Sequence, residues 1–596
     1  MNFDPKWLEG AQQFQKSMME NWTQAFKKMG STVGAGDIPN PFAALAGSAG
    51  QMPDWSSMMP NMGALKDVLA GGGNAPVQLD PTRMMEVQRQ YLQDVTQLWS
   101  QGGKPSLADR RFSNEAWAGN PVSSFSAALY LINAKTLMSM AEAVQGDAKT
   151  KARVRFAVQQ WIDASSPSNF LAFNAEAQKK AVETKGESIA KGVQNLLSDM
   201  KQGHVSMTDE SVFEVGKNVA TSEGSVVFQN ELFQLIEYKP LTAKVYERPF
   251  LLVPPCINKF YILDLQPDNS FIRYAVEQGH RTFVVSWRNP DESLAQTTWN
   301  EYIENAILKA ISVTQEITGA ETINALGFCV GGTMLATGLA VLAARGEKPV
   351  NSATFLTTLI DFSDTGILDV FIDDNFVKFR EMQFGNGGLM PGRDLATTFS
   401  FLRPNDLVWN YVVGNYLKGE TPPPFDLLYW NSDSTNLPGK YYAWYLRNTY
   451  LENKLIKPGT AEVCGEKIDL SQVDIPVYIY GSREDHIVPI GGAYATTQHL
   501  PGRKRFVMGA SGHIAGVINP ASKGKRSHWI GPANQFPVDV NDWIASAQEF
   551  KGSWWTDWSD WLQGHAGKQV AAPKAVGSRK YKVLEAAPGS YVKAKA

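Results

Sequence analysis

The sequence predicts an α/β protein in which a mostly parallel, doubly wound sheet follows an α-helical domain. Two observations predict this fold class. Between about residues 222 and 510, apolar segments of strand length alternate with segments of helix length. Upstream, apolar residues recur with the period of a helix, as at Met84, Val87, Tyr91 and Leu98. Alternating strands and helices are typical of a parallel sheet with helices on both faces.

Composition narrows the class of protein. The chain has 596 residues, of which 43% are hydrophobic and 19% charged, and its formal net charge is -3. This nearly neutral balance gives no reason to expect a nucleic-acid partner. Cys256, Cys329 and Cys464 form no CxxC pair and have no paired histidines beside them, so they predict neither a disulfide framework nor a metal site. With no signal-peptide pattern at the N-terminus, we expect a cytoplasmic protein with free thiols.

The N-terminal segment, residues 1–80, is expected to comprise an amphipathic helix and a flexible linker. Residues 1–30 carry an apolar stripe, and residues 30–80 are rich in glycine, proline, alanine and methionine. Ten of the 18 methionines fall within the first 85 residues. Because methionine offers adaptable apolar surface, this segment either adheres to an apolar partner or packs on its own protein.

The remaining chain divides into two expected domains. Residues 81–215 are expected to form the α-helical N-terminal domain, which carries no catalytic motif, and residues 216–596 the catalytic domain. Six apolar runs in the second domain have the length and composition of buried strands. They are Phe250–Val253, Thr282–Ser286, Ile323–Leu326, Ala353–Thr358, Val477–Tyr480 and Arg505–Met508.

An insertion from about residue 361 to 473 separates the fourth and fifth predicted strands. It is rich in aromatic residues and prolines and is too long for a loop, so we expect a cap subdomain over the carboxyl edge of the sheet. After Gly564 the chain carries seven basic residues and one acidic residue, which predicts a solvated basic tail. The tryptophans just before this tail are expected to pack in the core, with contact to a lipid or polymer as the alternative.

The strongest chemical motif is Gly327-Phe-Cys329-Val-Gly331, which lies between a predicted strand and a predicted helix. This is the setting of a nucleophile elbow, a strained turn whose flanking residues must be small. The helix N-terminus would also stabilise a thiolate. The motif therefore predicts an α/β-hydrolase fold with Cys329 as nucleophile. The alternatives are a packing turn around an inert cysteine, or a membrane helix over the uncharged stretch 322–344, which its glycines disfavour.

Two further residues are expected to complete the catalytic set. In an α/β-hydrolase, an acid and then a histidine follow the nucleophile along the chain. Asp485 follows the fifth predicted strand and His513 the sixth, so we predict Asp485 as the orienting acid and His513 as the base. His486 is a rival base, although a residue beside the acid can hardly receive its hydrogen bond. Asp361, after the fourth strand, is a rival acid.

An oxyanion in such a site needs two hydrogen-bond donors. The backbone N–H of Val330, directly after the nucleophile, is expected to be one donor. The second is expected from the loop after the first predicted strand, where the backbone near Ile257 and the side-chain amide of Asn258 are the candidates. Cys256 and Cys464 are expected to be structural.

Several segments of the sequence resemble class I polyhydroxyalkanoate synthases. The resemblance runs from about Arg83 to the C-terminus, and residues 1–80 lie outside it. The segments that carry it are LLVPPCINKFYILDL, FVVSWRNP, LGFCVGGT, LRPNDLVWNYVV, FDLLYWNSDSTNLPG, YIYGSREDHIVP and GASGHIAGVINP.

The resemblance implies polymerisation of (R)-3-hydroxyacyl-CoA into polyester with release of coenzyme A. It implies that Cys329 carries the growing chain as a thioester, with His513 activating the thiol and Asp485 supporting His513. Short-chain units such as 3-hydroxybutyryl are expected, with no cofactor and no metal, since the coenzyme A thioester is the substrate. The expected partners are the nascent polyester, the surface of a polymer granule, granule-associated proteins and a second copy of the chain.

Two other classes of function compete with this interpretation. One is an intracellular hydrolase of the same fold, either a thioesterase or a polyester depolymerase; the cysteine nucleophile and the long cap argue against it. The other is a non-enzymatic granule-coat protein that uses the Met-rich and Trp-rich segments as an adhesive. The ordered set of cysteine, aspartate and histidine argues against that class, because a coat protein needs no nucleophile elbow.

Overall fold

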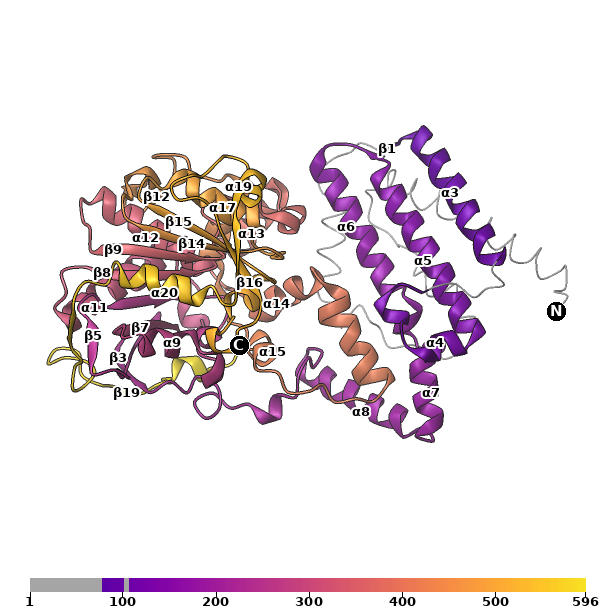
Figure 1. Cartoon of the computed structure of the whole chain (residues 1–596), viewed down its shortest axis with the longest axis horizontal. Helices are drawn as coiled ribbons and strands as arrows, with labels where there is room; N and C mark the ends of the chain where they lie inside the picture. The colour runs from indigo at the N-terminus through magenta and orange to yellow at the C-terminus, as the bar shows by residue number, and fades with distance from the viewer. Residues whose placement is uncertain (1–77, 101–106) are drawn as a thin grey trace. The chain divides into compact units, whose positions relative to one another are not determined.

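The computed structural model describes residues 78–100 and 107–596. Expectations that concern residues 1–77 lie outside this range. The chain divides into two units: the first contains the described residues up to Val205 together with Pro404–Glu420, and the second contains Ser206–Arg403 and Thr421–Ala596 (Figure 1). Part of the expected cap insertion, Pro404–Glu420, is therefore grouped with the helical unit. The first unit ends at Val205, upstream of the expected boundary at residue 215.

The first unit is helical, as its 3.6-residue pattern predicts. Helix α5 begins at Pro121, behind an N-cap residue, Asn120, that accepts hydrogen bonds from two backbone N–H groups. The α-helices described in the first unit are α3 (Pro81–Ser100), α4 (Glu115–Gly119), α5 (Pro121–Glu142), α6 (Ala148–Ala164), α7 (Ala175–Glu183) and α8 (Glu187–Gln202). The unit also contains the π-helical segments η9 (Asn405–Trp409) and η10 (Val412–Leu417). A short ladder pairs β1 (Gln78–Leu79) with β2 (Val144–Gln145).

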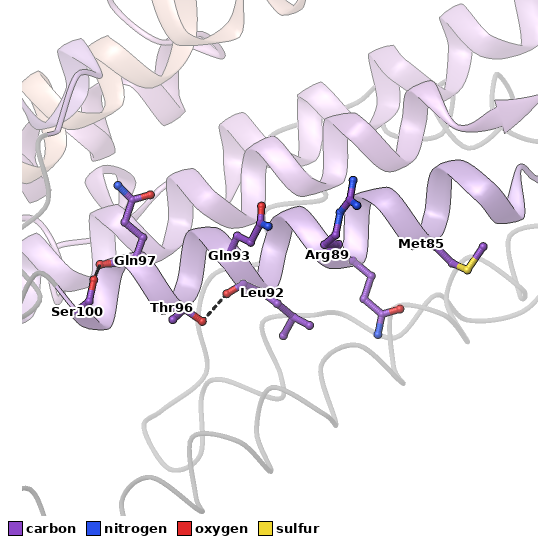
Figure 2. Close-up of a pocket in the computed structure, with 8 residues that line it drawn as sticks. Met85, Arg89, Leu92, Gln93, Thr96, Gln97 and Ser100 are labelled. Carbon is purple, nitrogen blue, oxygen red and sulfur yellow. Dashed lines mark hydrogen bonds between the residues drawn. The ribbon is translucent and has the colours of Figure 1, made fainter.

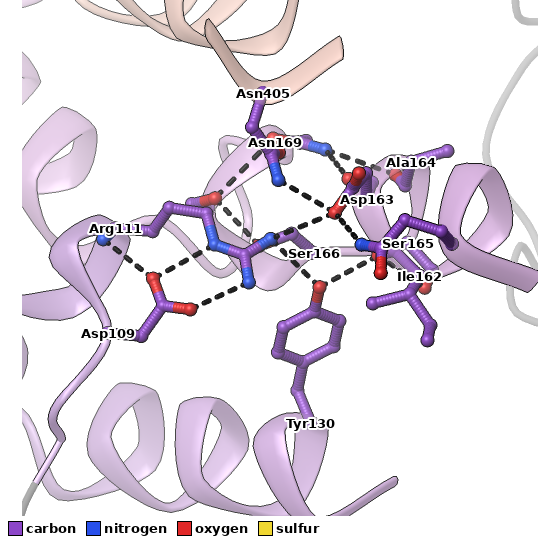
Figure 3. A network of polar contacts seen from close by, with 12 residues as sticks. Asp109, Arg111, Tyr130, Ile162, Asp163, Ala164, Ser165, Ser166, Asn169 and Asn405 are labelled. Carbon is purple, nitrogen blue, oxygen red and sulfur yellow. Dashed lines mark hydrogen bonds and ion pairs between the residues drawn. The ribbon is translucent and has the colours of Figure 1, made fainter. Parts of the chain in front are cut away.

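A polar network joins several elements of this unit (Figure 3). The Arg111 guanidinium donates two hydrogen bonds to the Asp109 carboxylate, at 3.0 and 2.8 Å, and one to the Tyr130 hydroxyl at 2.9 Å. It also lies 3.8 Å from the buried carboxylate of Asp163. Asn405 donates to the same carboxylate at 2.7 Å, so the network ties η9 to α6.

The second unit is built on a sheet that, within the described residues, has 11 strands in the order β17-β16-β15-β14-β9-β8-β6-β7-β4-β3-β19. The six central strands are parallel, and they are the six that the sequence predicts: β6 (Phe250–Val253), β7 (Thr282–Trp287), β8 (Ile323–Phe328), β9 (Val350–Leu356), β14 (Val477–Ser482) and β15 (Lys504–Gly509).

Antiparallel strands that the sequence analysis did not identify extend both edges of the sheet. They are β3 (Gly224–Gln229), β4 (Phe233–Tyr238), β16 (Ser527–Ile530), β17 (Gln548–Lys551) and β19 (Glu585–Ala586). The C-terminal tail, expected to be solvated, therefore adds strand β19 to the sheet, and its β18 (Gln569–Ala571) pairs with β5 (Lys244–Tyr246).

Helices cover both faces of the sheet, and the strand pleat divides the core between them. Leu251 and Val253 pack with the helices of one face, whereas Phe250 and Leu252 pack with those of the other. The first face is covered by α11 (Lys309–Thr318), α12 (Val330–Ala344) and α17 (Ile490–His499), and the second by α9 (Phe271–Glu277) and α20 (Trp555–Gln563). This is the doubly wound arrangement that the sequence predicts.

The tryptophans near the C-terminus belong to the core, as expected. Trp554, Trp555 and Trp558 are each at most 2% exposed and pack against β6, α9 and β14. The uncharged stretch 322–344 is a strand, a turn and a helix rather than one membrane span. In the part of the chain that the structure describes, no helix has both the length and the hydropathy needed to cross a bilayer.

The insertion between β9 and β14 contributes mainly helices to the second unit. They are α13 (Asp374–Phe384), α14 (Gly392–Phe401), α15 (Asp426–Ser432), α16 (Gly439–Tyr445) and the π-helical segment η11 (Leu446–Leu451). Short ladders pair β10 (Leu389–Met390) with β11 (Leu437–Pro438) and β12 (Glu462–Val463) with β13 (Glu466–Lys467). Trp299, on the element α10 (Trp299–Tyr302), stacks on Tyr441, Trp444 and Tyr445 of α16.

The polar network of the helical unit makes a stability prediction with a matched control next to it. Arg111→Met leaves the buried Asp163 and the Tyr130 hydroxyl without their cationic partner, so we expect a loss of about 2–3 kcal/mol in the free energy of unfolding. Arg110→Met removes only an exposed ion pair with Asp406, whose two side chains are 80% and 36% exposed, and should cost less than about 1 kcal/mol. Urea unfolding followed by circular dichroism measures both variants. Equal losses would contradict the structural role of the network.

Candidate active site

Cys329 occupies the turn between β8 and α12. It is the N-cap residue of α12, with φ 53° and ψ -127°. A positive φ is unfavourable for any residue with a Cβ atom, and such strain is typical of a nucleophile elbow. The Cys329 N–H donates to the Leu356 carbonyl at 2.9 Å, which ties the turn to the neighbouring strand β9.

Three glycines allow this turn to pack as it does. A Cβ atom on Gly327 would lie within 3.0 Å of the Gly332 backbone, and one on Gly332 would lie within 3.0 Å of the Thr358 side chain. A Cβ atom on Gly331 would lie within 3.0 Å of the carbonyl oxygen of Val253, at the end of β6. The small residues of the motif are therefore required by the close approach of helix, strands and loop around Cys329.

His513 and Asp485 lie together at the carboxyl edge of the sheet. Asp485 follows β14, and His513 begins α18 (His513–Val517) after β15. The His513 Nδ1 atom lies 2.6 Å from Asp485 Oδ2, and both side chains are buried. The other oxygen, Oδ1, accepts hydrogen bonds from the N–H groups of Ile487 and Val488 at 2.8 and 2.9 Å. Both carboxylate oxygens are therefore occupied, which leaves the acid in one orientation.

His513 also interacts with Cys329, and this contact affects its protonation. Burial lowers the pKa of His513, but the Asp485 carboxylate and a Cys329 thiolate, each through its charge and a hydrogen bond, outweigh burial and raise the pKa to about 10. Phe328 stacks on the imidazole, with ring centroids 5.8 Å apart. The Asp485 carboxylate therefore favours the protonated, positively charged form of the imidazole beside the Cys329 thiol.

The rival acid Asp361 has a different partner. Its carboxylate lies 2.8 Å from His499 Nε2 and accepts a 2.8 Å hydrogen bond from Asn453. Burial raises the pKa of Asp361, but these hydrogen bonds outweigh it and hold the pKa far below the ordinary range. The structure thus places Asp485, rather than Asp361, against His513. The rival base His486 directly follows Asp485 in the chain.

One expected oxyanion donor lies in the elbow itself, and the other belongs to the loop that packs against it. Val330 is the first residue of α12, and N–H groups in the first turn of a helix have no acceptor within the helix. In the loop after β6, the Ile257 carbonyl accepts a hydrogen bond from the Thr435 N–H at 3.1 Å, and Asn258 forms an antiparallel backbone bridge with Ser434. The buried Oδ1 atom of Asn258 has no hydrogen-bond partner. Loop and elbow are neighbours, because Gly331 packs against the end of β6.

The other two cysteines have different surroundings. Cys256 is buried, and its Sγ atom lies 3.1 Å from the Tyr441 hydroxyl. Burial raises the pKa of Cys256 to about 12, partly opposed by that hydrogen bond. The Cys464 Sγ atom lies 3.4 Å from the Asn300 carbonyl, and burial and Glu304 raise its pKa to about 12. Both thiols are therefore protonated at neutral pH.

Tyrosines of the insertion approach Cys329, which sequence reasoning did not specify. The phenols of Tyr445 and Tyr450 have a raised pKa, first through burial and also through the charge of a Cys329 thiolate. Both residues lie in the run KYYAWYLRNTYL, and Tyr441 and Tyr445 share one helix face at i, i+4 spacing. The aromatic run was visible in the sequence, but its position beside the nucleophile was not.

A hollow elsewhere in the molecule is unrelated to these residues. It runs along one face of α3 and is lined by residues such as Met85, Arg89, Leu92 and Thr96 (Figure 2). It lies in the helical unit, and its lining contains neither a cysteine nor a histidine. Across residues 78–100 and 107–596, no group of three or more His, Cys, Asp or Glu side chains is placed to hold a metal ion.

Comparison with known proteins establishes the family. Residues 108–275 match the model described as the N-terminus of poly-beta-hydroxybutyrate polymerase (PhaC), and residues 249–520 match the alpha/beta hydrolase fold. A poly(3-hydroxyalkanoate) polymerase subunit PhaC from Cupriavidus necator is 57% identical over 89% of this chain and 91% of its own length. The chain belongs to the poly(3-hydroxyalkanoate) polymerase family. The resemblance stated from the sequence is thereby confirmed, as is the α/β-hydrolase fold.

Two further members of the polymerase family show the same extent of similarity. The subunit PhaC from Rhizobium meliloti is 39% identical and covers 87% of each chain. A poly(3-hydroxyalkanoate) polymerase from Methylorubrum extorquens is 40% identical over 87% of this chain and 88% of its own. Similarity of this extent spans both units and the elbow, so this protein is an acyltransferase-type member of the family.

The charge environment of His513 predicts a pH dependence of stability. The pKa of His513 is raised from 6.5 to about 10 on folding. The stabilisation that this shift gives to the folded protein is therefore fully present below the unfolded pKa and is lost as the pH rises towards the folded pKa. The free energy of unfolding of the wild type, relative to His513→Gln, should therefore decrease between pH 6.5 and 10. Urea midpoints of both proteins across this interval measure the difference. A difference that stays constant with pH would show that no imidazolium is held there.

Proposed function

We propose that this protein polymerises (R)-3-hydroxyacyl-CoA into a polyester, with release of coenzyme A, through a covalent thioester on Cys329. The observation that carries the proposal is the 2.6 Å contact between His513 and Asp485 beside the elbow thiol, in a chain of the polymerase family. We expect short-chain units such as 3-hydroxybutyryl, and neither a cofactor nor a metal.

In the acylation step, the Cys329 thiolate attacks the carbonyl carbon of the bound thioester. A bond forms between that carbon and the Cys329 sulfur, and the bond to the sulfur of coenzyme A breaks. The departing sulfur takes the proton of the His513 imidazolium, so coenzyme A leaves as a neutral thiol and His513 becomes neutral. The negative charge that develops on the carbonyl oxygen is stabilised by the Val330 N–H and by a donor from the loop of Ile257 and Asn258.

In the elongation step, the 3-hydroxyl group of the next unit attacks the acyl carbon on Cys329. Neutral His513 accepts the hydroxyl proton, an oxygen–carbon bond forms, and the Cys329 thiolate is restored as the leaving group. Acylation has removed the anion that supported the imidazolium, so the histidine is available as a base when the hydroxyl arrives. Asp485 then stabilises the imidazolium that forms.

Cysteine suits this sequence of steps better than serine does. Transfer of the acyl group from one thiol to another is nearly thermoneutral, so the intermediate keeps the energy of the thioester. That energy is released when the hydroxyl forms the more stable oxoester. A serine would form an oxoester at the first step and leave less driving force for elongation. Tyr445 and Tyr450, the tyrosines of the insertion beside Cys329, shield the thioester from water, so that transfer competes with hydrolysis.

The proposal extends to location and partners. A polymerase whose product is an insoluble polyester acts at the boundary between cytoplasm and polymer, so we propose that it associates with the granule surface and with proteins there. We also propose that it acts as a homodimer. A hydrolase of the same fold is the alternative function, because residues 249–520 match the alpha/beta hydrolase fold. Release of insoluble polyester with coenzyme A distinguishes the polymerase from a hydrolase, which would release free hydroxy acid.

The nucleophile assignment predicts the behaviour of two substitutions. Cys329→Ala and Cys329→Ser should each lower coenzyme A release from 3-hydroxybutyryl-CoA by about 10⁴-fold or more. Alanine has no nucleophilic atom, and the serine hydroxyl has no readily accessible anion. Cys464→Ala removes a thiol outside the proposed reaction and serves as the control, with activity retained. A thiol reagent that detects coenzyme A measures release, and near-UV circular dichroism checks folding. Turnover by a folded Cys329→Ala protein would exclude this residue as the nucleophile.

The acid assignment predicts a division between the two steps. Asp485→Asn keeps the imidazole but removes the charge that stabilises the imidazolium formed when an alcohol is deprotonated, so elongation should fall by about 10³-fold or more. Acylation starts from a thiolate and should be affected much less, so that acyl-enzyme accumulates. Mass spectrometry of the quenched protein measures the acyl-enzyme.

Asp361→Asn is the matched control for this experiment. It breaks the pair with His499, which lies outside the proposed triad, and should leave polymerisation in place. If Asp361→Asn is inactive while Asp485→Asn polymerises normally, the two assignments are reversed. If Asp485→Asn fails at acylation as completely as Cys329→Ala, the proposed division of labour is wrong.

A further inference from the structure

The C-terminal tail ends on the loop that follows β6. Lys259, at the end of this loop, is 2% exposed, and its Nζ atom donates to the Ala594 carbonyl. Asn289, in the loop after β7, donates to the Lys595 carbonyl at 2.7 Å. Two successive carbonyl groups of the tail are therefore the acceptors for side chains from two loops at the carboxyl edge of the sheet.

A buried carboxylate completes this arrangement. Asp433 accepts a 2.9 Å hydrogen bond from the Tyr261 hydroxyl and lies 3.2 Å from the Lys595 ammonium. Burial lowers the pKa of Lys259 to about 8, although the Asp433 charge opposes the shift. Because a buried amine depends strongly on its few polar partners, the Ala594 carbonyl is important for holding Lys259 in place.

The same region is held from the side of the insertion. Thr435 N–H donates to the Ile257 carbonyl at 3.1 Å. Asn436 N–H donates to the Asn289 side chain at 3.0 Å. Trp430 donates from its indole to the Lys259 carbonyl at 2.7 Å. The loop from Pro254 to Lys259 therefore has neighbours on two sides, the segment 430–436 and the C-terminal tail.

This loop also abuts the nucleophile turn. Val253, the last residue of β6, is paired in register with Gly327 of β8. The first turn of α12 packs against Val253 and Pro254 so closely that Gly331 has no room for a Cβ atom. On the opposite side, Trp287 donates to the Pro254 carbonyl at 2.8 Å. A displacement of the loop would therefore change the distance between its hydrogen-bond donors and the carbonyl oxygen of a substrate that reacts at Cys329.

The geometry points to a positioning function for the C-terminal tail: Ala594 and Lys595 hold the Pro254–Lys259 loop where it stabilises the oxyanion, and Lys259 is the residue that joins the loop to the tail. This inference rests on the proposed function, since it assigns the loop to the acyl-transfer reaction. Lys259 is a positioning residue, because it acts through the loop rather than on the substrate.

The test distinguishes an effect on oxyanion stabilisation from an effect on the reactivity of the Cys329 thiol. Lys259→Met removes the ammonium but keeps a chain of similar length. Lys593→Met makes the same change at an exposed tail position and is the control. For each protein, single-turnover release of coenzyme A from 3-hydroxybutyryl-CoA measures acylation, in which an oxyanion forms. Alkylation of Cys329 by iodoacetamide measures the reactivity of the thiol in a reaction that forms no oxyanion.

Lys259→Met should lower the rate constant for acylation by about 100-fold through loop displacement, with KM and the alkylation rate at wild-type values. Lys593→Met should match the wild type in the acylation rate constant, in KM and in the alkylation rate. Deletion of residues 594–596 removes both tail acceptors without touching the loop and should reproduce the effect of Lys259→Met. The deletion decides the question if Lys259→Met does not fold.

Two results would overturn the inference. Wild-type acylation in a folded Lys259→Met protein and in the deletion would show that the tail does not position the loop. An equal loss of acylation and alkylation would show general damage to the site rather than displacement of an oxyanion donor. The wild-type protein tests the proposed function separately: if it releases no coenzyme A from 3-hydroxybutyryl-CoA, the proposed function fails, whereas the ratio between variant and wild type concerns only the tail.

Discussion

The close approach of backbone segments around Cys329 is the constraint on which the rest of the catalytic unit depends. The strained turn at Cys329 persists because β9 accepts its N–H group and because glycines let α12 lie against β6 and β9. Side chains at those glycine positions would separate the elbow from the loop that faces it. The parallel sheet, with α12 on one face, is thus the support that keeps a nucleophile in an unfavourable backbone conformation.

Much of this arrangement could be predicted from the sequence, because parallel strands buried on both faces are continuous apolar runs. All six central strands were recognisable for that reason. Once strand ends are known, the residues after them must meet at one edge of the sheet. Asp485 and His513 could therefore be placed near Cys329, and the structure brings His513 and Asp485 to 2.6 Å.

The parts that the sequence did not predict depend on partners far away in the chain. Three of the unpredicted strands, β16, β17 and β19, have only four, four and two residues, and every residue of β17 is exposed, so it has no apolar pattern to recognise. The pair of His499 and Asp361 joins residues 138 positions apart, and no local signal indicates it. The C-terminal tail has the composition of a solvated segment, yet its backbone pairs with β3 and β5. Backbone pairing of this kind leaves little trace in side-chain composition.

The assignment of Pro404–Glu420 to the helical unit has a consequence for how the chain could be rearranged. The polypeptide leaves the catalytic unit after Arg403, joins the helices, and returns at Thr421. In the helical unit, Gly192 packs directly on the Tyr416 backbone, and Asn195 donates to the carbonyls of Asn415 and Glu420. A single cut near residue 205 would therefore separate α8 from residues that lie 220 to 225 positions later in the chain. A chimaera between two members of this family must exchange both segments together, and recombination within either one alone would join mismatched surfaces.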